Sequence, residues 1–394
     1  MKRLIALLVI GLLVVSPSAQ AVPKKITVNP LKLLTTIGSP SEVSGVVVSG
    51  KNLIVFGTQN SRAYAKALNS SGVELWKLQL DQSQSSIATA AVVDTVGDIW
   101  VTGASPLAAT SIGSAQAAIN PDNAIMPATT FIGDLKALTV WKISSAGTLV
   151  ATYTLPTGNV ILPNSITLDD SGLAIAGSIA GEKINAGFMI LMNSSGLFSK
   201  ILQLGSSSTT LESIARNADK TFTLVGSSGE TIADKKLAGI IDGVIIKVNK
   251  SLKISSVVRS SISKGKRIWN SASSTLLLGG EVVVGNKSEI AVTKFSSRYA
   301  PSWTYRFAGT GAAFTAGSTQ LAFVSNGVIP ELAWNPKVPT ALLITFNSKG
   351  AISAADSAPV GQRLLVGSLD SKEFGPLVIT SSADLVSIFV RNTR

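Results

Sequence analysis

The feature that most constrains the fold is a unit of about 50 residues that recurs seven times along the chain. Each copy contains a short apolar run that ends in Gly or Ser. The runs lie at residues 53–57, 99–103, 173–177, 222–226 and 276–280, with looser copies at 321–325 and 377–381. Such runs predict strands buried on both faces, and a closing Gly permits a bulge or a close backbone approach. Short strands repeated at this period predict radial blades around a channel, which is a β-propeller.

The N-terminal segment can supply the strand that the last copy of the repeat lacks. The seventh copy lacks a fourth strand, because the chain ends at Arg394 soon after the apolar run at 385–390. Residues 31–39 match the fourth strand and exit of the third copy at 201–206. We therefore expect an all-β, seven-bladed β-propeller of four-stranded antiparallel blades, in which the N-terminal strand closes the last blade and removes an exposed sheet edge. Six blades with irregular segments remain the alternative, because the last two copies are weak.

The turns and hairpins of the repeat resemble those of bacterial secreted β-propeller repeat proteins, over nearly all of the chain that follows the leader. The resemblance rests on the turn at 94–97, the strand that follows it, and the hairpin at 72–77. That hairpin is also distantly similar to the Gly-to-Trp stretch of quinoprotein-like propellers. Trp recurs at the matching place only as Trp303, and the chain has no Cys for the adjacent Cys pair of quinoprotein dehydrogenases. The resemblance thus implies a relative in shape, without the cofactor site.

Residues 1–21 have the pattern of a signal peptide. A basic start at Lys2 and Arg3 precedes an apolar stretch at 4–15 and an Ala-Gln-Ala cleavage site at 19–21. The apolar stretch is shorter than the roughly 20 residues that span a bilayer. We expect residues 22–394 to form a single propeller domain without a transmembrane segment. The expected location is secreted, extracellular or at the cell surface, or periplasmic if the host has an outer membrane.

Composition narrows the chemistry. The chain contains no His and no Cys, so the sequence excludes imidazole triads, thiolate nucleophiles and His or Cys zinc sites. It also lacks a phosphate-binding loop and the oxygen-ligand ladder of a calcium loop, and we expect no cofactor and no metal. Carboxylate chemistry survives, as in glycan hydrolysis by paired acids. The closest acidic sets are Asp94 with Asp98 and Asp169 with Asp170, and these positions are typical of turns.

The charge balance points to an acidic partner. The chain carries +12, and loss of Lys2 and Arg3 with the leader leaves +10. The candidate ligand-binding residues belong to two basic clusters and include two tryptophans. One cluster is Lys264, Lys266 and Arg267, with Trp269 close behind it; the other is Lys235 and Lys236; and Trp334 lies in a predicted loop. A cationic exported surface suits an anionic surface polymer, a polysaccharide or a protein. Nucleic acid is disfavoured, because the chain has an export signal and no basic helix or regular aromatic platform.

Strand order predicts that one face of the propeller is variable. It holds the long insertion at 104–136, the loops at 228–242 and 325–339, and both basic clusters. Irregular loops on a rigid scaffold are where binding usually resides. We expect a non-catalytic binding or scaffold module for a surface polymer, such as a glycan or an anionic wall polymer, or for a protein. The alternative is a carboxylate-dependent glycan hydrolase or lyase.

Overall fold

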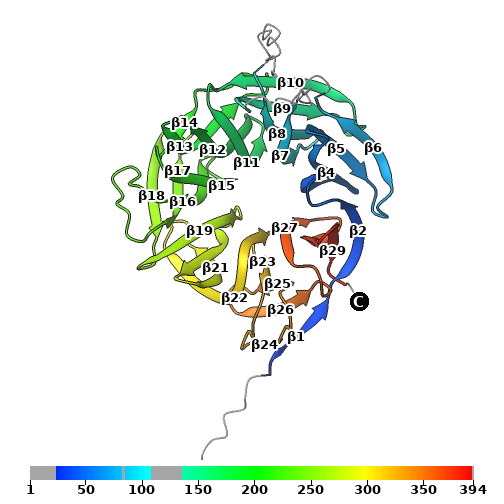
Figure 1. Cartoon of the computed structure of the whole chain (residues 1–394), viewed down its shortest axis with the longest axis vertical. Helices are drawn as coiled ribbons and strands as arrows, with labels where there is room; N and C mark the ends of the chain where they lie inside the picture. Colours follow the sequence, from blue (N-terminus) through cyan, green and yellow to red (C-terminus); the bar gives the residue numbers. More distant parts are fainter. Residues whose placement is uncertain (1–23, 82–84, 108–134, 393–394) are drawn as a thin grey trace, which may run out of the picture.

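The computed structural model describes residues 24–81, 85–107 and 135–392 of the chain. Over these residues it is an all-β propeller, with antiparallel sheets arranged radially around a central axis (Figure 1). The predicted leader at 1–21 and most of the predicted insertion lie outside the described residues.

Five blades are separate four-stranded sheets. In chain order their strands are β3 (Val43–Ser49), β4 (Asn52–Gln59), β5 (Arg62–Leu68) and β6 (Glu74–Gln79); β7 (Ile87–Val93), β8 (Ile99–Ser105), β9 (Ala137–Ile143) and β10 (Leu149–Pro156); β11 (Val160–Asp169), β12 (Gly172–Gly181), β13 (Ile184–Met192) and β14 (Leu202–Leu204); β15 (Thr209–Arg216), β16 (Phe222–Ser228), β17 (Asp242–Val248) and β18 (Ile254–Ser260); and β27 (Leu364–Ser371), β28 (Gly375–Ser381), β29 (Val386–Val390) and β2 (Lys32–Gly38). Five of the seven predicted apolar runs lie in the second strands of these blades. The other two lie in, or at the start of, strands at the corresponding places in the rest of the ring.

The rest of the ring is one nine-stranded sheet, and the prediction of seven, or six, separate four-stranded blades is therefore wrong. Its strands are β19 (Gly265–Ala272), β20 (Leu277–Val284), β21 (Lys287–Phe295), β22 (Pro301–Ala316), β23 (Gln320–Ser325), β25 (Thr340–Phe346), β26 (Ile352–Ser357), β1 (Ile26–Pro30) and β24 (Leu332–Ala333). The physical reason lies in β22. Residues 301–308 pair with β21 and residues 309–316 pair with β23, so the backbone stays extended where a loop was expected to separate two blades.

The N-terminal segment joins the last blade to the nine-stranded sheet. β2 pairs antiparallel with β29, with Lys32 opposite Val390, which confirms the predicted pairing of the two chain ends. The repeat pattern did not predict β1, which pairs in parallel with β26 and β24 on the neighbouring sheet. Leu31 and Ile37 are buried beside this junction. Arg391 crosses the same junction, and its guanidinium donates hydrogen bonds to Asp356 at 2.7 and 2.9 Å.

A β-bulge recurs in the inner strands, and it explains the Gly that closes the best copies of the repeat. The register of β7, for example, shifts at Thr89, between Ala88 and Ala90, and Gly103 of β8 pairs with Ala88. A Cβ on Gly103 would lie 1.7 Å from the carbonyl oxygen of Ile87. The predicted close backbone approach is thus confirmed at this glycine.

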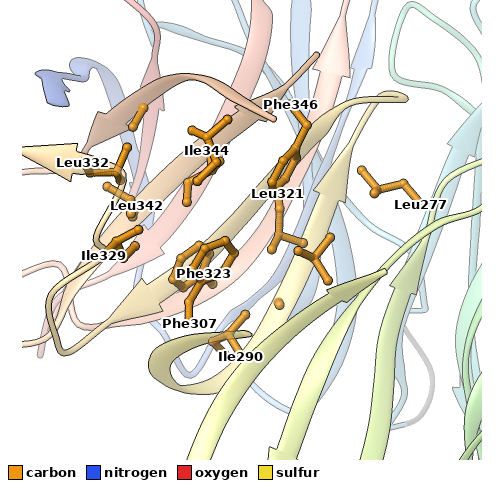
Figure 2. Packing of buried hydrophobic residues seen from close by; sticks show 14 residues of the cluster. Leu277, Ile290, Phe307, Leu321, Phe323, Ile329, Leu332, Leu342, Ile344 and Phe346 are labelled. Carbon is orange, nitrogen blue, oxygen red and sulfur yellow. The ribbon is translucent and has the colours of Figure 1, made fainter. Parts of the chain in front are cut away.

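Each sheet buries its faces against its neighbours, and Figure 2 shows the largest of these contacts. There Leu277 and Ile290 of one half of the nine-stranded sheet meet Leu321, Phe323 and Leu342 of the other half. The stacked rings of Phe307 and Phe323, with centroids 5.2 Å apart, extend the packing. Apolar contact between sheets is therefore continuous around β22.

Candidate functional site

The loop between β16 and β17, residues 229–241, carries one of the two predicted basic clusters and is tightly anchored. The loop ends at Asp242, the first residue of β17. This residue is fully buried, and its carboxylate accepts hydrogen bonds from the amides of Ala238 and Gly239 at 3.0 and 2.9 Å. Arg259 of β18 donates to the same carboxylate at 3.1 Å and to the carbonyl of Lys235 at 3.1 Å. Burial alone raises the pKa of Asp242, but these hydrogen bonds outweigh it and lower the pKa. The carboxylate therefore stays ionised and holds the loop in one conformation.

Glu230 fastens the start of the same loop to the neighbouring link between β14 and β15. Its carboxylate accepts hydrogen bonds from the amides of Ser206, Ser207 and Ser208, at 2.9 to 3.1 Å for Oε1, and from the Thr209 hydroxyl at 2.7 Å. Burial on its own raises the pKa of Glu230, but the hydrogen bonds prevail and lower it to about 2. Three consecutive amides aimed at one carboxylate form an anion-binding nest that the chain fills itself.

The second basic cluster lies beside this loop. The link from β18 to β19 makes a tight turn, in which Lys264 has a positive φ of 54° and the Gly265 amide donates to the Ile262 carbonyl at 3.2 Å. The Ile240 amide then donates to the Gly265 carbonyl at 2.9 Å, and Ile241 forms a parallel bridge with Lys266. Loop 229–241 is thus joined through its backbone to the first residues of β19, directly after link 261–264.

Four of the seven predicted ligand-binding residues meet at this junction. Lys235, Lys236, Lys264 and Lys266 are all exposed. Within the described ranges, none of their ammonium groups forms an ion pair with a carboxylate. We call these four residues the lysine cluster. Asp234, beside Lys235, is an exposed carboxylate of the same loop.

The other two members of the second predicted cluster are buried between sheets instead. Arg267 is 7% exposed and Trp269 is fully buried, with the guanidinium carbon 4.1 Å from the indole centroid. Arg267 donates to the Thr293 hydroxyl at 3.2 Å, and burial, with a smaller contribution from Arg306, lowers its pKa to about 10. The alternation of side chains along β19 explains the difference, because Lys266 and Arg267 point to opposite faces of the sheet. These two side chains are part of the packing and present no surface to a partner.

Trp334 lies in the long loop between β23 and β25. Its indole is half-buried, packs against the core shown in Figure 2, and donates a hydrogen bond to the Ser325 hydroxyl at 3.2 Å. The loop is therefore anchored by the indole. The side chain does not lie free for stacking, and it belongs to a different part of the ring from the lysine cluster.

The bulged inner strands form a second polar feature, which the sequence analysis did not single out. Ser44, Thr89, Asn164 and Val366 each sit at a bulge, and all four line a cavity of about 270 Å³. Four separate sheets contribute them, so the cavity lies near the axis. The bulged residue of β15 is Glu212, the one charged residue among the bulges named here. The signal in the sequence is an apolar residue, the bulged residue and then Gly, Ala or Ser.

The carboxylates that a glycan hydrolase would need as catalysts form hydrogen bonds and ion pairs within turns. Asp94 accepts hydrogen bonds from the amides of Val96 and Asp98 and from the Trp100 indole, at 2.9 to 3.2 Å. Asp169 accepts from the amide of Ser171 at 2.8 Å and forms a 2.7 Å ion pair with Arg216. Burial acts to raise the pKa of Asp169, yet the hydrogen bonds and Arg216 lower it. An acid catalyst requires a raised pKa, whereas the pKa of Asp169 is lowered. In the part of the chain that the structure covers, no three acidic side chains group as metal ligands.

Comparison with known proteins gives no family. Neither a protein-family model nor a curated protein matches the sequence. Among solved structures, the WD40 domain of coronin from Toxoplasma gondii is 9% identical, with 94% of this chain and 90% of that chain covered and a TM-score of 0.49. A protein of unknown function from Bacteroides caccae is 11% identical, with 84% and 99% covered and a TM-score of 0.37. At these scores neither likeness carries an argument about function, and neither places the chain among the bacterial secreted propellers that its repeats resemble.

Among the residues that the structure describes, no helix has the length and apolar character needed to cross a bilayer.

Proposed function

We propose that the chain is a non-catalytic binding module that holds an anionic partner, such as a surface polymer, through the lysine cluster. The observation that carries the proposal is the backbone junction of loop 229–241 with the start of β19, because the joined segments carry four exposed lysines. Their charge is not neutralised by an ion pair within the described residues, so it remains available to a partner. Propellers commonly serve as binding or scaffold modules, with their loops as the contact surface.

The anchoring of the loop supports the proposal further. Glu230 and Asp242 fix both ends of loop 229–241 by hydrogen bonds, and Arg259 ties it to β18. A partner that binds an ordered loop does not have to order it first, which lowers the free-energy cost of binding. The hydrolase alternative gains no comparable support, because Asp94 and Asp169 are engaged in turns.

The test is retention on immobilised dextran sulfate. Replacing Lys235, Lys236, Lys264 and Lys266 by Gln should lower the salt concentration needed for elution, because surface charges act through screened Coulomb attraction. The matched control replaces four exposed lysines in the turns of the opposite face, Lys51, Lys250, Lys253 and Lys349, which changes net charge equally. Equal loss of retention in both variants would assign binding to net charge and reject the lysine cluster as the site.

We also propose that the protein is exported and begins at Val22 after cleavage. Support comes from the basic start, the short apolar stretch and the Ala-Gln-Ala motif. Mass spectrometry of the protein from the culture medium or periplasm should give an N-terminus at Val22. An intact Met1 terminus in the cytosolic fraction would contradict export.

A further inference from the structure

The segments that carry the lysine cluster also carry exposed aliphatic side chains. Ile240 is 54% exposed and Val284, at the end of β20, is 40% exposed. Gly265 lies between them, because its carbonyl accepts a hydrogen bond from the Ile240 amide and it pairs with Val284 across β19 and β20. A Cβ at position 265 would lie 2.6 Å from Ile262 Cγ2 and 2.9 Å from Val284 Cγ2. The side chains of Ile262 and Val284 therefore cover a buried glycine, and the backbone of Ile240 lies against the carbonyl of the same glycine.

A fifth lysine borders the same surface. Lys287 pairs directly with Val284 across the β20–β21 hairpin, and it is exposed. It stands at the same end of the sheet as Gly265, the first residue of β19. In the described part of the chain its ammonium group forms no ion pair. The joined segments thus carry exposed aliphatic side chains together with five exposed cationic side chains: Lys235, Lys236, Lys264, Lys266 and Lys287.

We propose that this surface docks on an anionic lipid bilayer, with the lysines at the headgroups and Ile240 and Val284 inserted at the boundary of the acyl chains. The inference rests on the proposed function and names the partner. Two observations favour a bilayer over a soluble polyanion. Lysine ammonium groups on long stems reach headgroup level while exposed aliphatics enter the layer beneath, whereas a hydrated polyanion offers nothing apolar to Ile240. The anchored loop also presents both kinds of side chain together.

Both kinds of side chain should contribute measurably. Each lysine near an anionic membrane surface strengthens binding by about fivefold, and this part weakens with salt. The insertion of Ile240 and Val284 buries several methyl and methylene groups, and it should strengthen binding by at least about tenfold. Only the lysine contribution should appear on dextran sulfate.

The test is co-sedimentation of the protein with vesicles, in parallel with retention on dextran sulfate. One set of vesicles contains equal parts of phosphatidylglycerol and phosphatidylcholine, and the other contains phosphatidylcholine alone. The test variant is Ile240→Ser with Val284→Ser. Its matched control is Val73→Ser with Val96→Ser, two exposed valines in turns of the opposite face. Thermal unfolding of each variant checks that the fold is retained.

We expect binding to the phosphatidylglycerol vesicles only, weakened at least about tenfold by Ile240→Ser with Val284→Ser and unchanged in the control. Retention on dextran sulfate should be the same for all three proteins. If the aliphatic variant binds vesicles as well as the parent does, or if the protein binds dextran sulfate and no vesicles, the bilayer inference is overturned and polyanion binding stands. If the protein binds neither probe, the proposed function falls as well.

Discussion

At the scale of single residues, a backbone constraint explains the Gly that recurs at the end of the second strand of the repeat. The closing Gly of the second strand faces a bulge in the first strand, and the carbonyl that the bulge displaces occupies the place of a Cβ. Cβ atoms on Gly57, Gly103 and Gly226 would lie 1.9, 1.7 and 2.0 Å from such carbonyl oxygens. These glycines are thus required by a close approach and not by an unusual φ.

Gly103→Ala should therefore destabilise the propeller strongly. The methyl group can be accommodated only if β7 and β8 separate, and we expect a loss of about 3 kcal/mol in the free energy of unfolding. Gly367→Ala is the control, because a Cβ there meets only Ile379 Cδ1, at 3.9 Å. Urea unfolding of both variants makes the comparison, and equal midpoints would show that the bulge adjusts without cost.

Glu212 is the second residue whose environment predicts a measurable effect. It is the bulged residue of β15, and its side chain has no hydrogen-bond or ion-pair partner among the described residues. Burial raises its pKa above the ordinary 4.5. The folded protein therefore binds this proton more tightly than the unfolded chain, and stability falls as pH rises from 4.5 through the raised pKa.

Glu212→Gln should remove this pH dependence. At pH 7 the variant should unfold at a higher temperature than the parent, because no carboxylate has to be buried. Below about pH 4 the parent's carboxyl is neutral, and the two unfolding midpoints should converge. Parallel curves across this pH range would mean that the Glu212 carboxylate is well solvated.

At the scale of the element, loop 229–241 is held by polar contacts and by one apolar side chain, Ile232, which is buried in a core cluster between sheets. The pKa of Glu230 is lowered because its carboxylate accepts hydrogen bonds from the Ser206–Ser208 amides. Since the pKa is lower in the folded protein than in the unfolded chain, the ionised carboxylate stabilises the fold. This stabilisation is fully present above the unfolded pKa of about 4.5, and it is lost as pH falls from there through about 2.

Glu230→Ala should release this loop while the blades stay folded. It leaves three amides without their acceptor, and we expect a loss of about 2 kcal/mol in local stability. Amide hydrogen exchange should become faster in residues 231–240 at pH 7. The control is Glu331→Ala, which removes an exposed carboxylate from another loop. Unchanged exchange would show that Asp242 and Arg259 hold the loop without Glu230.

At the scale of the whole molecule, the ring is closed by the N-terminal segment. β2 supplies the outer strand of the last blade, β1 adds to the neighbouring sheet, and Arg391 pairs with Asp356 across the same junction. Closure by strands from both chain ends removes sheet edges that would otherwise template aggregation. It also makes the stability of the ring depend on residues 26–38, which form β1 and β2.

Deletion through Ser39 should therefore cost far more than deletion through Lys25. The longer deletion removes β1, β2 and the buried side chains of Leu31 and Ile37, and we expect a loss of more than about 5 kcal/mol together with aggregation. The shorter one ends before β1, and the two described residues that it removes, Lys24 and Lys25, are exposed. Thermal unfolding and light scattering measure both effects. Coincident midpoints for the two truncations would show that the ring closes without its N-terminal strands.

The sequence by itself determined the propeller architecture, the places of the second strands and the pairing of the two chain ends, because apolar runs and turn residues are local signals of strand position. It also located three lysines of the lysine cluster on loops, whereas Lys266 lies in β19. The tertiary structure alone decided that β22 continues from one half of the nine-stranded sheet to the other, since the dihedral angles of that link are set by pairing with both β21 and β23. It likewise decided that Arg267 is buried while Lys266 is exposed, and that Lys287 and Ile240 lie beside the lysine cluster. Those outcomes depend on strand register and on packing between sheets that are distant in sequence, and neither is encoded in any short stretch of residues.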